Sequence, residues 1–150
     1  MPYQTFPTYL RSSKVGNSGE FVASSPDEKA LLEECREAGF DFLGCSLDGE
    51  MEVSLKGEQT VSFRKLCELE FDSYRKCMSV VVRDNETGVV HVVSKGAETA
   101  MLPKCVSGPV TATATVVDNF ASEGLRTLVF GHKVNFGQFF IIKINISARC

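Results

Sequence analysis

Residues 60–84 contain the feature that most limits how this chain can fold. Up to Phe71, apolar residues alternate with polar ones, and Val61, Phe63, Leu69 and Phe71 share one parity. A period of two predicts a strand with one buried face and one exposed face. Residues 72–76, Asp-Ser-Tyr-Arg-Lys, suit a turn, and the Val-rich run that follows favours a second strand. The sequence therefore predicts a hairpin with strands over roughly 60–72 and 77–84. An aromatic residue and several cations at its bend could hold a flat, anionic ligand.

A helix and a second hairpin are predicted before this one. Ser25-Pro26-Asp27-Glu28 combines a capping residue, a proline at the first helical position and the glutamate of a capping box. Apolar residues at helical spacing follow, and Gly39 suits a helix end, so we expect a helix over 26–38. Strands over 40–47 and 51–55 flank Asp48-Gly49, a dipeptide typical of tight hairpin turns.

The second half of the chain continues with mixed signals. We expect a strand over 89–95 and a short helix over 97–102 that Pro103 ends. Residues 109–123 are rich in Thr and Val, which favour strand, but their apolar residues recur at helical spacing before Gly124, which favours a helix from about 111. A strand over 125–133 follows. Hairpin-linked strands with a few helices predict an α+β domain built on an antiparallel sheet.

Composition narrows the class of protein. With 150 residues the chain is long enough for one domain, and its formal charge, 16 − 19 = −3, argues against generic binding to nucleic acid or membrane surfaces. No apolar run approaches the ~20 residues of a membrane helix, and no signal peptide is evident. The six cysteines lack metal-type spacing, so we expect reduced thiols and no zinc site. We divide the chain into a loosely ordered segment (1–21), a domain (22–133) and an unusually apolar C-terminal segment (134–150).

Four short stretches carry side chains suited to one ligand: 25–30, 71–78, 94–98 and 124–128. An aromatic ring can stack on a base, a carboxylate can accept a hydrogen bond from an amino group, and lysines and an arginine can neutralise phosphates. Each residue also has a structural explanation. Glu28 is also explained as the return half of a capping box, Phe71 as the last core residue of its strand, and Met78 as a core residue. The three cations are also explained as solvent-exposed charges: Lys76, Lys95 and Arg126.

Taken together, these stretches resemble the nucleotide-binding domain of type IV P-type ATPases, the phospholipid-transporting flippases. The resemblance rests on Ser-Pro-Asp-Glu at 25–28, Leu-Glu-Phe-Asp-Ser-Tyr-Arg-Lys-Cys-Met at 69–78, Lys-Gly-Ala-Glu at 95–98 and Phe-Ala-Ser-Glu-Gly-Leu-Arg-Thr-Leu at 120–128. It covers roughly residues 22–133. The Lys-Gly-Ala motif is general to P-type ATPases, whereas the first two motifs point to the lipid branch.

The resemblance implies a twisted antiparallel sheet flanked by helices and an ATP site. By this resemblance Glu28 contacts the adenine amino group, Phe71 stacks on adenine, Lys95 lines the base pocket and Arg126 binds the phosphate chain. Ser73, Lys76 and Met78 would complete the pocket wall. Three features depart from the family: Cys77 replaces a commonly basic residue, Lys29 replaces a small or apolar one, and residues 134–150 do not match the usual polar helix.

The Asp-Lys-Thr-Gly motif that the family phosphorylates is missing from this sequence. The resemblance therefore implies a chain that binds ATP, with Mg²⁺ held mainly outside it, and that presents ATP to a phosphorylation domain on the cytoplasmic side of a membrane. The chain alone would be soluble and have little hydrolytic activity. Two alternatives remain open: a truncated remnant or interaction module that keeps the fold without the ligand, and the nucleotide-binding domain of a cation-transporting P-type ATPase.

Overall fold

The structure, a computed structural model, describes residues 14–15, 21–22, 25–134 and 139–142. In this part of the chain seven strands form one sheet in the order β3-β4-β5-β6-β7-β8-β9, and β1 pairs with β2 separately. All neighbouring strands run antiparallel. The strands are β1 (Lys14–Val15), β2 (Phe21–Val22), β3 (Phe40–Cys45), β4 (Glu50–Leu55), β5 (Gln59–Asp72), β6 (Cys77–Asp84), β7 (Val90–Gly96), β8 (Val129–Val134) and β9 (Phe139–Ile142). The predicted α+β class is confirmed.

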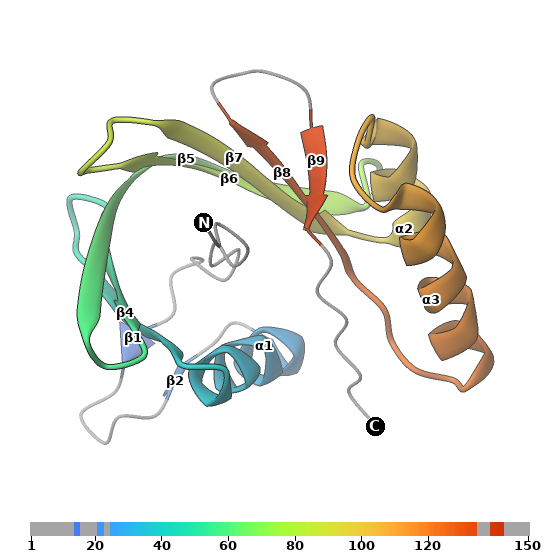
Figure 1. The fold of residues 1–150 in the computed structure, drawn as a ribbon, viewed down its shortest axis with the longest axis horizontal. Coiled ribbons are helices and arrows are strands. Elements are labelled where there is room, and N and C mark those ends of the chain that lie inside the picture. The colour runs from blue at the N-terminus through green and yellow to red at the C-terminus, as the bar shows by residue number, and fades with distance from the viewer. Residues whose placement is uncertain (1–13, 16–20, 23–24, 135–138, 143–150) are drawn as a thin grey trace.

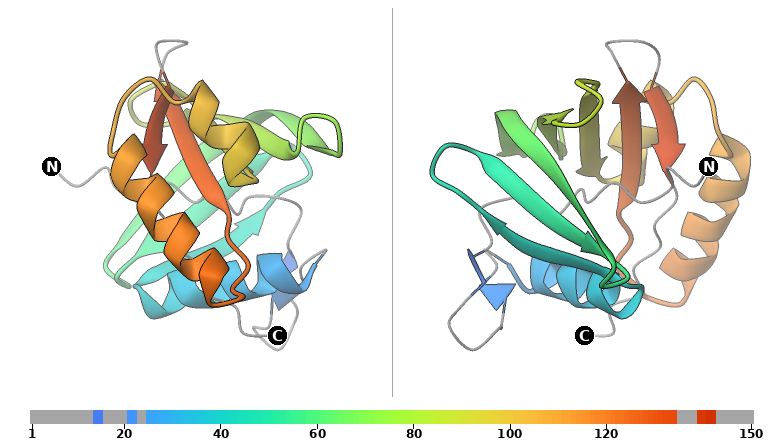
Figure 2. Two further views of the ribbon diagram at one scale, coloured as in Figure 1. Left: turned by 90° about the vertical axis from the view of Figure 1, so that its right-hand side faces the viewer. Right: turned by 60° about the vertical axis from the view of Figure 1, so that its left-hand side comes forward.

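The helices are α1 (Pro26–Glu37), α2 (Glu98–Met101), a 3₁₀ turn η1 (Leu102–Lys104) and α3 (Val110–Ser122). Helix α1 begins as predicted, because Ser25 Oγ accepts a hydrogen bond from the backbone N–H of Glu28 at 3.2 Å and Pro26 occupies the first turn. The sheet curves over α1, while α2 and α3 lie beyond β8 (Figures 1 and 2). Helices thus flank the sheet on both faces.

Each face of the sheet has its own apolar core. On the face toward α1, which we call the α1 face, Leu31 and Leu32 are part of a cluster with buried strand residues, including Met78 and Phe130. The adjacent residues of the same strands, Cys77 and Val129, point to the other side of the sheet. There they pack with Met101 of α2 and Val117 of α3. We call this second side the α3 face. The helices therefore stabilise opposite sides of β6 and β8.

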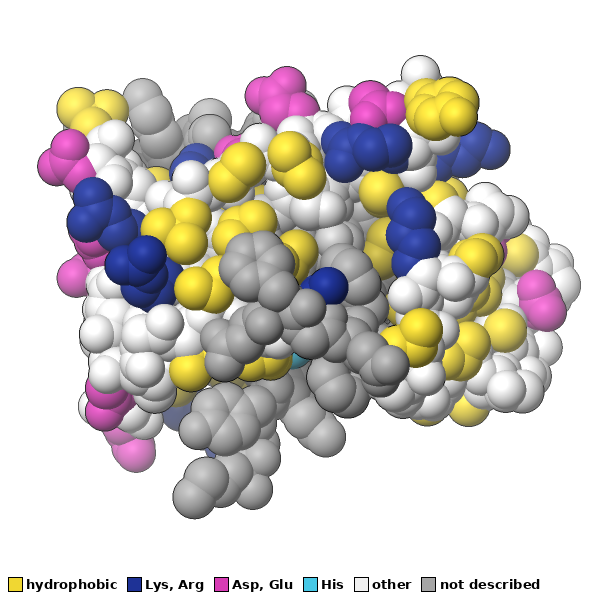
Figure 3. Space-filling model, turned by 90° about the horizontal axis from the view of Figure 1, so that it is seen from above, with side chains coloured by type: hydrophobic (Ala, Val, Ile, Leu, Met, Phe, Trp, Pro, Cys, Tyr) yellow, Lys and Arg dark blue, Asp and Glu magenta, His cyan; other side chains and the backbone are white. Residues whose placement is uncertain are grey.

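Two irregularities in the β5–β6 pair change which face each β5 residue occupies. The register shifts between Lys65 and Cys67 and again between Leu69 and Asp72, so β5 carries an extra residue at each place. The first shift turns Leu69, opposite Ser79, to the α3 face, and the second returns Phe71 to the α1 face. The prediction that Leu69 and Phe71 continue a buried face is wrong, since they are 47% and 57% exposed. Hydrophobic side chains also gather on the outer side of the sheet (Figure 3).

Two other boundaries differ from the sequence prediction. The strand expected over 125–133 begins only at Val129, because Gly124 (φ 74°) ends α3 and the Leu125 N–H remains bonded to the Phe120 carbonyl at 3.0 Å. The short helix predicted over 97–102 is α-helical only to Met101, two residues before Pro103, and the chain continues as the 3₁₀ turn η1, whose first turn tolerates the missing N–H of Pro103. In the segments predicted over 1–21 and 134–150, the structure describes only β1, part of β2, Val134 and β9. No described helix is long and apolar enough to cross a bilayer.

Candidate functional site

The four sequence stretches meet at one pocket on the α1 face of the sheet. Its volume is about 530 Å³, within the range of about 300–1,000 Å³ that is usual for small-molecule sites. The N-terminus of α1, the bend between β5 and β6, the end of β7 and the segment between α3 and β8 contribute its walls. The lining residues are Ser25, Asp27, Glu28, Phe71, Lys76, Met78, Lys95, Gly96, Ala97, Arg126, Thr127 and Leu128.

A buried ion pair forms the floor of the pocket. Lys95 Nζ lies 3.4 Å from Glu28 Oε1, and both side chains are only 8% exposed. Lys95 stands opposite Met78 on β6 and Phe130 on β8, so its stem runs along apolar neighbours. The first turn of α1 brings Glu28 over the sheet. A buried charge requires an oppositely charged partner, and here the Lys95 ammonium and the Glu28 carboxylate are partners of one another.

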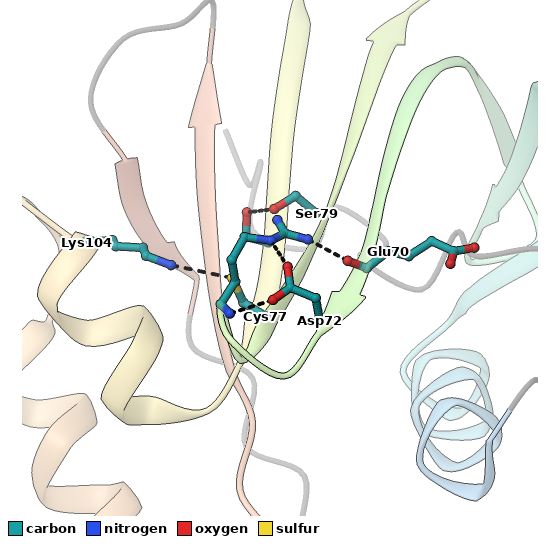
Figure 4. Close-up of polar contacts among 7 residues, drawn as sticks. Glu70, Asp72, Cys77, Ser79 and Lys104 are labelled. Carbon is teal, nitrogen blue, oxygen red and sulfur yellow. Dashed lines mark hydrogen bonds and ion pairs between the residues drawn. The ribbon is translucent and has the colours of Figure 1, made fainter.

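The bend between β5 and β6 is held by its own side chains. The Asp72 carboxylate accepts a hydrogen bond from the Arg75 backbone N–H at 2.7 Å and also forms an ion pair with the Arg75 guanidinium. These bonds from Arg75 lower the pKa of the Asp72 carboxyl below its usual value. Figure 4 shows Asp72 at the end of β5, the Glu70 carboxylate pointing away from it, and Lys104 reaching toward Cys77. The bend thus has a defined shape without any contribution from a ligand.

A glycine allows β7 to approach this bend closely. A Cβ atom on Gly96 would lie 2.4 Å from the carbonyl oxygen of Lys76, which also accepts a hydrogen bond from the Ala97 N–H at 3.1 Å. Lys76 itself has φ 52°, in the left-handed region that non-glycine residues seldom adopt. This contact therefore fixes the backbone from which the Lys76 side chain projects.

An exposed ring and a buried thioether form the wall between floor and bend. Phe71 is 57% exposed, although it lines the pocket, whereas Met78 is 3% exposed and belongs to the core. A half-exposed phenyl ring that is not packed into the core offers a flat apolar surface to a ligand. The interpretation of Phe71 as the last core residue of its strand is therefore wrong.

A second ion pair lies at the rim. Arg126 Nη2 is 2.8 Å from Asp27 Oδ2, and the two side chains are 66% and 32% exposed. Arg126 comes from the irregular segment between α3 and β8, and Asp27 from the first turn of α1. The lining as a whole contains three cations, Lys76, Lys95 and Arg126, and two carboxylates, Asp27 and Glu28. Its balance is one positive charge, which suits an anionic ligand.

The structure brings six of the seven predicted site residues to this pocket: Glu28, Phe71, Lys76, Met78, Lys95 and Arg126. Ser73 lies in the exposed turn at the bend and does not line the pocket. Sequence reasoning did not single out Asp27 and Gly96. Both stand beside predicted residues, within the Ser-Pro-Asp-Glu and Lys-Gly-Ala motifs, so position in a motif was the available signal. The nucleotide-binding roles themselves stay predictions.

Comparison with known proteins identifies the family. The family model for the P-type ATPase cytoplasmic domain N matches residues 8–138. The chain belongs to this family of N domains. The family agrees with the α+β fold of the structure and with the resemblance to P-type ATPases that the sequence motifs carry.

Relatives of this N domain include phospholipid-transporting ATPases. It is 37% identical over 123 residues to phospholipid-transporting ATPase IH of Homo sapiens, covering 82% of this chain and 11% of the relative. It is 37% identical over 130 residues to phospholipid-transporting ATPase FetA of Mus musculus, covering 84% of this chain and 11% of the relative. A probable phospholipid-transporting ATPase 11 of Arabidopsis thaliana is 37% identical over 123 residues, 77% of this chain and 10% of the relative. The N domain thus spans about a tenth of the length of these relatives. The two alternatives, a cation-pump domain and a remnant without the ligand, are not favoured.

Proposed function

We propose that this N domain binds ATP in the pocket between α1 and the β5–β6 bend and presents it to a phosphorylation domain that is not part of this sequence. The observation that carries the proposal is the convergence of Glu28, Phe71, Lys95 and Arg126, four residues far apart in the sequence, on one pocket. Membership of the P-type ATPase N-domain family supports it independently.

The chemistry of each part of the pocket suits a different part of the nucleotide. The exposed face of Phe71 can stack on adenine, and the apolar Met78 beside it adds contact area. The Glu28 carboxylate at the floor can accept a hydrogen bond from the adenine amino group. At the rim, Arg126 and Lys76 can bind the phosphates, the arginine through a planar fork of donors and the lysine as a point charge.

The proposal includes limits on activity. In our account Mg²⁺ arrives with the nucleotide and takes most of its ligands outside this chain. The N domain supplies no aspartate in an Asp-Lys-Thr-Gly motif. It therefore binds ATP without hydrolysing it, and it acts as part of a phospholipid translocase on the cytoplasmic side of a membrane.

Titration with ATP tests the proposal. A stacked base and a few charge-assisted hydrogen bonds, without a closing partner domain, predict a dissociation constant of roughly micromolar to millimolar. Phe71→Ala should weaken ATP binding by about 1–3 kcal/mol, as loss of base–aromatic stacking does. Calorimetric titration measures the dissociation constant, and circular dichroism checks that the variant is folded.

Leu69→Ala is the matched control. Leu69 is a large apolar residue of the same strand with comparable exposure, but it lies on the α3 face, away from the pocket. Its loss should leave ATP affinity unchanged. Equal losses for the two variants, or an unchanged affinity in a folded Phe71→Ala protein, would remove Phe71 from the site. Sustained phosphate release from ATP by the pure chain would contradict the non-hydrolytic role.

A further inference from the structure

The ion pair at the pocket rim has a role that the proposed function leaves open. Asp27 Oδ2 lies 2.8 Å from Arg126 Nη2, and both residues line the pocket. We propose that Asp27 is a positioning residue, whose carboxylate holds the Arg126 guanidinium at the rim so that its other N–H groups meet the phosphate chain. The inference rests on the proposed function, because it concerns the orientation of a phosphate-binding side chain.

Arg126 is the partner that needs orientation. Its side chain is 66% exposed and projects from the irregular segment between α3 and β8, so few packing contacts restrict it. A long side chain of this kind loses considerable rotamer freedom when a ligand fixes it. A side chain that is already oriented loses less on binding, which strengthens affinity without a new ligand contact.

Asp27 is the partner that can provide orientation. It lies in the first turn of α1, where Ser25 caps the helix and Pro26 fixes the backbone, so its Cα position is defined by regular structure. Its short side chain has few rotamers, and the positive end of the helix dipole favours its charge. The stiffer residue therefore anchors the more flexible one across the pocket mouth.

The guanidinium can serve Asp27 and a phosphate at once. The ion pair is made through Nη2, whereas the planar fork of an arginine carries five N–H donors in total. Asp27 also places a negative charge near the phosphates, which opposes their binding. The two effects have opposite signs, so the direction of the change on removing Asp27 distinguishes orientation from simple competition for Arg126.

A double-mutant cycle tests the inference. Amide chemical-shift titrations with ADP and with adenosine are run on the wild type, Asp27→Ala, Arg126→Ala and the double variant. We expect Asp27→Ala to weaken ADP binding about three- to tenfold, in the lower part of the range usual for residues in contact, and to leave adenosine binding unchanged. In the Arg126→Ala background the same substitution should change ADP binding less than about twofold. Asp27→Glu should recover part of the loss.

Glu33→Ala is the matched charge control. Glu33 is an exposed carboxylate of the same helix, paired with Lys29 at 3.7 Å, and it does not line the pocket. Its removal should leave ADP binding unchanged. Tighter ADP binding by Asp27→Ala, an equal loss in both Arg126 backgrounds, or an unchanged ratio of ADP to adenosine affinity would overturn the inference while leaving the proposed function standing. Absence of binding of both ligands to the wild type would overturn both.

Discussion

The two ion pairs of the pocket share their chemistry but differ in their surroundings. Glu28 and Lys95 at the floor are each 8% exposed, whereas Arg126 and Asp27 at the rim are 66% and 32% exposed. A buried pair depends on both partners, because removal of one leaves a charge that neither water nor protein compensates. An exposed pair is screened by solvent and contributes little to stability.

The difference separates two tasks within one pocket. The floor connects α1 to the sheet through Glu28 and Lys95 and continues into the core on the α1 face, so it determines whether the pocket forms. With the rim pair Asp27 and Arg126 we group the exposed side chains Phe71 of the wall and Lys76 of the bend, because all four are more exposed than the floor pair and remain available to a ligand. Substitutions at the floor should therefore affect folding first, and substitutions at the rim should affect binding first.

The largest effect is expected at the floor. Lys95→Ala leaves the Glu28 carboxylate buried without its ammonium partner, and we expect a loss of about 3–5 kcal/mol in the free energy of unfolding. Denaturant titration followed by circular dichroism measures it. The double variant Glu28→Gln/Lys95→Met removes both charges and should lose clearly less. If the single variant loses under about 1 kcal/mol, the floor pair behaves like an exposed pair and the comparison fails.

A smaller loss is expected where β7 approaches the bend. Gly96→Ala places a methyl group 2.4 Å from the Lys76 carbonyl oxygen and 2.6 Å from the Cys77 Cβ, so one of the two strands must move. Overpacking of this kind typically lowers stability by about 1–3 kcal/mol. Thermal unfolding tests it. An unchanged melting temperature would show that β7 and the bend are not held as closely as described.

A buried histidine pair extends the comparison to pH. His91 Nδ1 and His132 Nε2 lie 2.9 Å apart on the α1 face, and burial with the neighbouring His91 lowers the pKa of His132 to about 4, from 6.5. Burial also lowers the pKa of His91, although Asp84 opposes this. Between pH 4 and 6.5 the unfolded chain therefore binds more protons than the folded chain. The stability that the neutral histidine pair contributes is complete above pH 6.5 and is lost as the pH falls toward 4.

We expect this loss to be about 3 kcal/mol at most, since the pKa of His132 falls from 6.5 to about 4 and one unit of pKa corresponds to about 1.4 kcal/mol. Denaturant titrations at several pH values measure it. In His132→Gln the slope of stability against pH between 6.5 and 4 should decrease. An equal slope in the variant would assign the pH dependence to other groups.

The smallest stability effects are expected at the rim. Asp27→Asn and Phe71→Ala should each change the free energy of unfolding by less than about 1 kcal/mol, because one breaks an exposed ion pair and the other shortens a half-exposed side chain. The same denaturant titrations measure both. A loss comparable to that of Lys95→Ala would mean that the rim is part of the core and would remove the distinction between the two tasks.

Local signals in the sequence were sufficient for most of the fold. The cap at Ser25 and Pro26 placed the start of α1, and the turn residues at 72–76 placed the bend within the observed limits of β5 and β6. The pairing of β3 with β4 and of β5 with β6 followed, because a hairpin joins strands that are neighbours in the sheet. These features depend on residues close together in the chain, and for that reason periodicity and turn chemistry reveal them.

What the sequence did not predict depends on distant partners. The exposure of Leu69 follows from a register shift between β5 and β6, and alternation within β5 alone carries no record of it. The pairs Glu28–Lys95 and Asp27–Arg126 join residues far apart in the chain, so only the folded structure identifies the partners. The tight approach at Gly96 is likewise a contact between β7 and the bend.

The most direct test of the central claim is the map of amide chemical-shift changes when ATP is added to the isotopically labelled chain. Our account predicts that the shifts cluster at Glu28, at residues 71–78, around Lys95 and at Arg126, and that they saturate with a single dissociation constant. It also predicts that Phe71→Ala weakens this response while the fold persists. Shifts confined to other surfaces, or no shifts at millimolar ATP, would contradict an ATP site in this pocket.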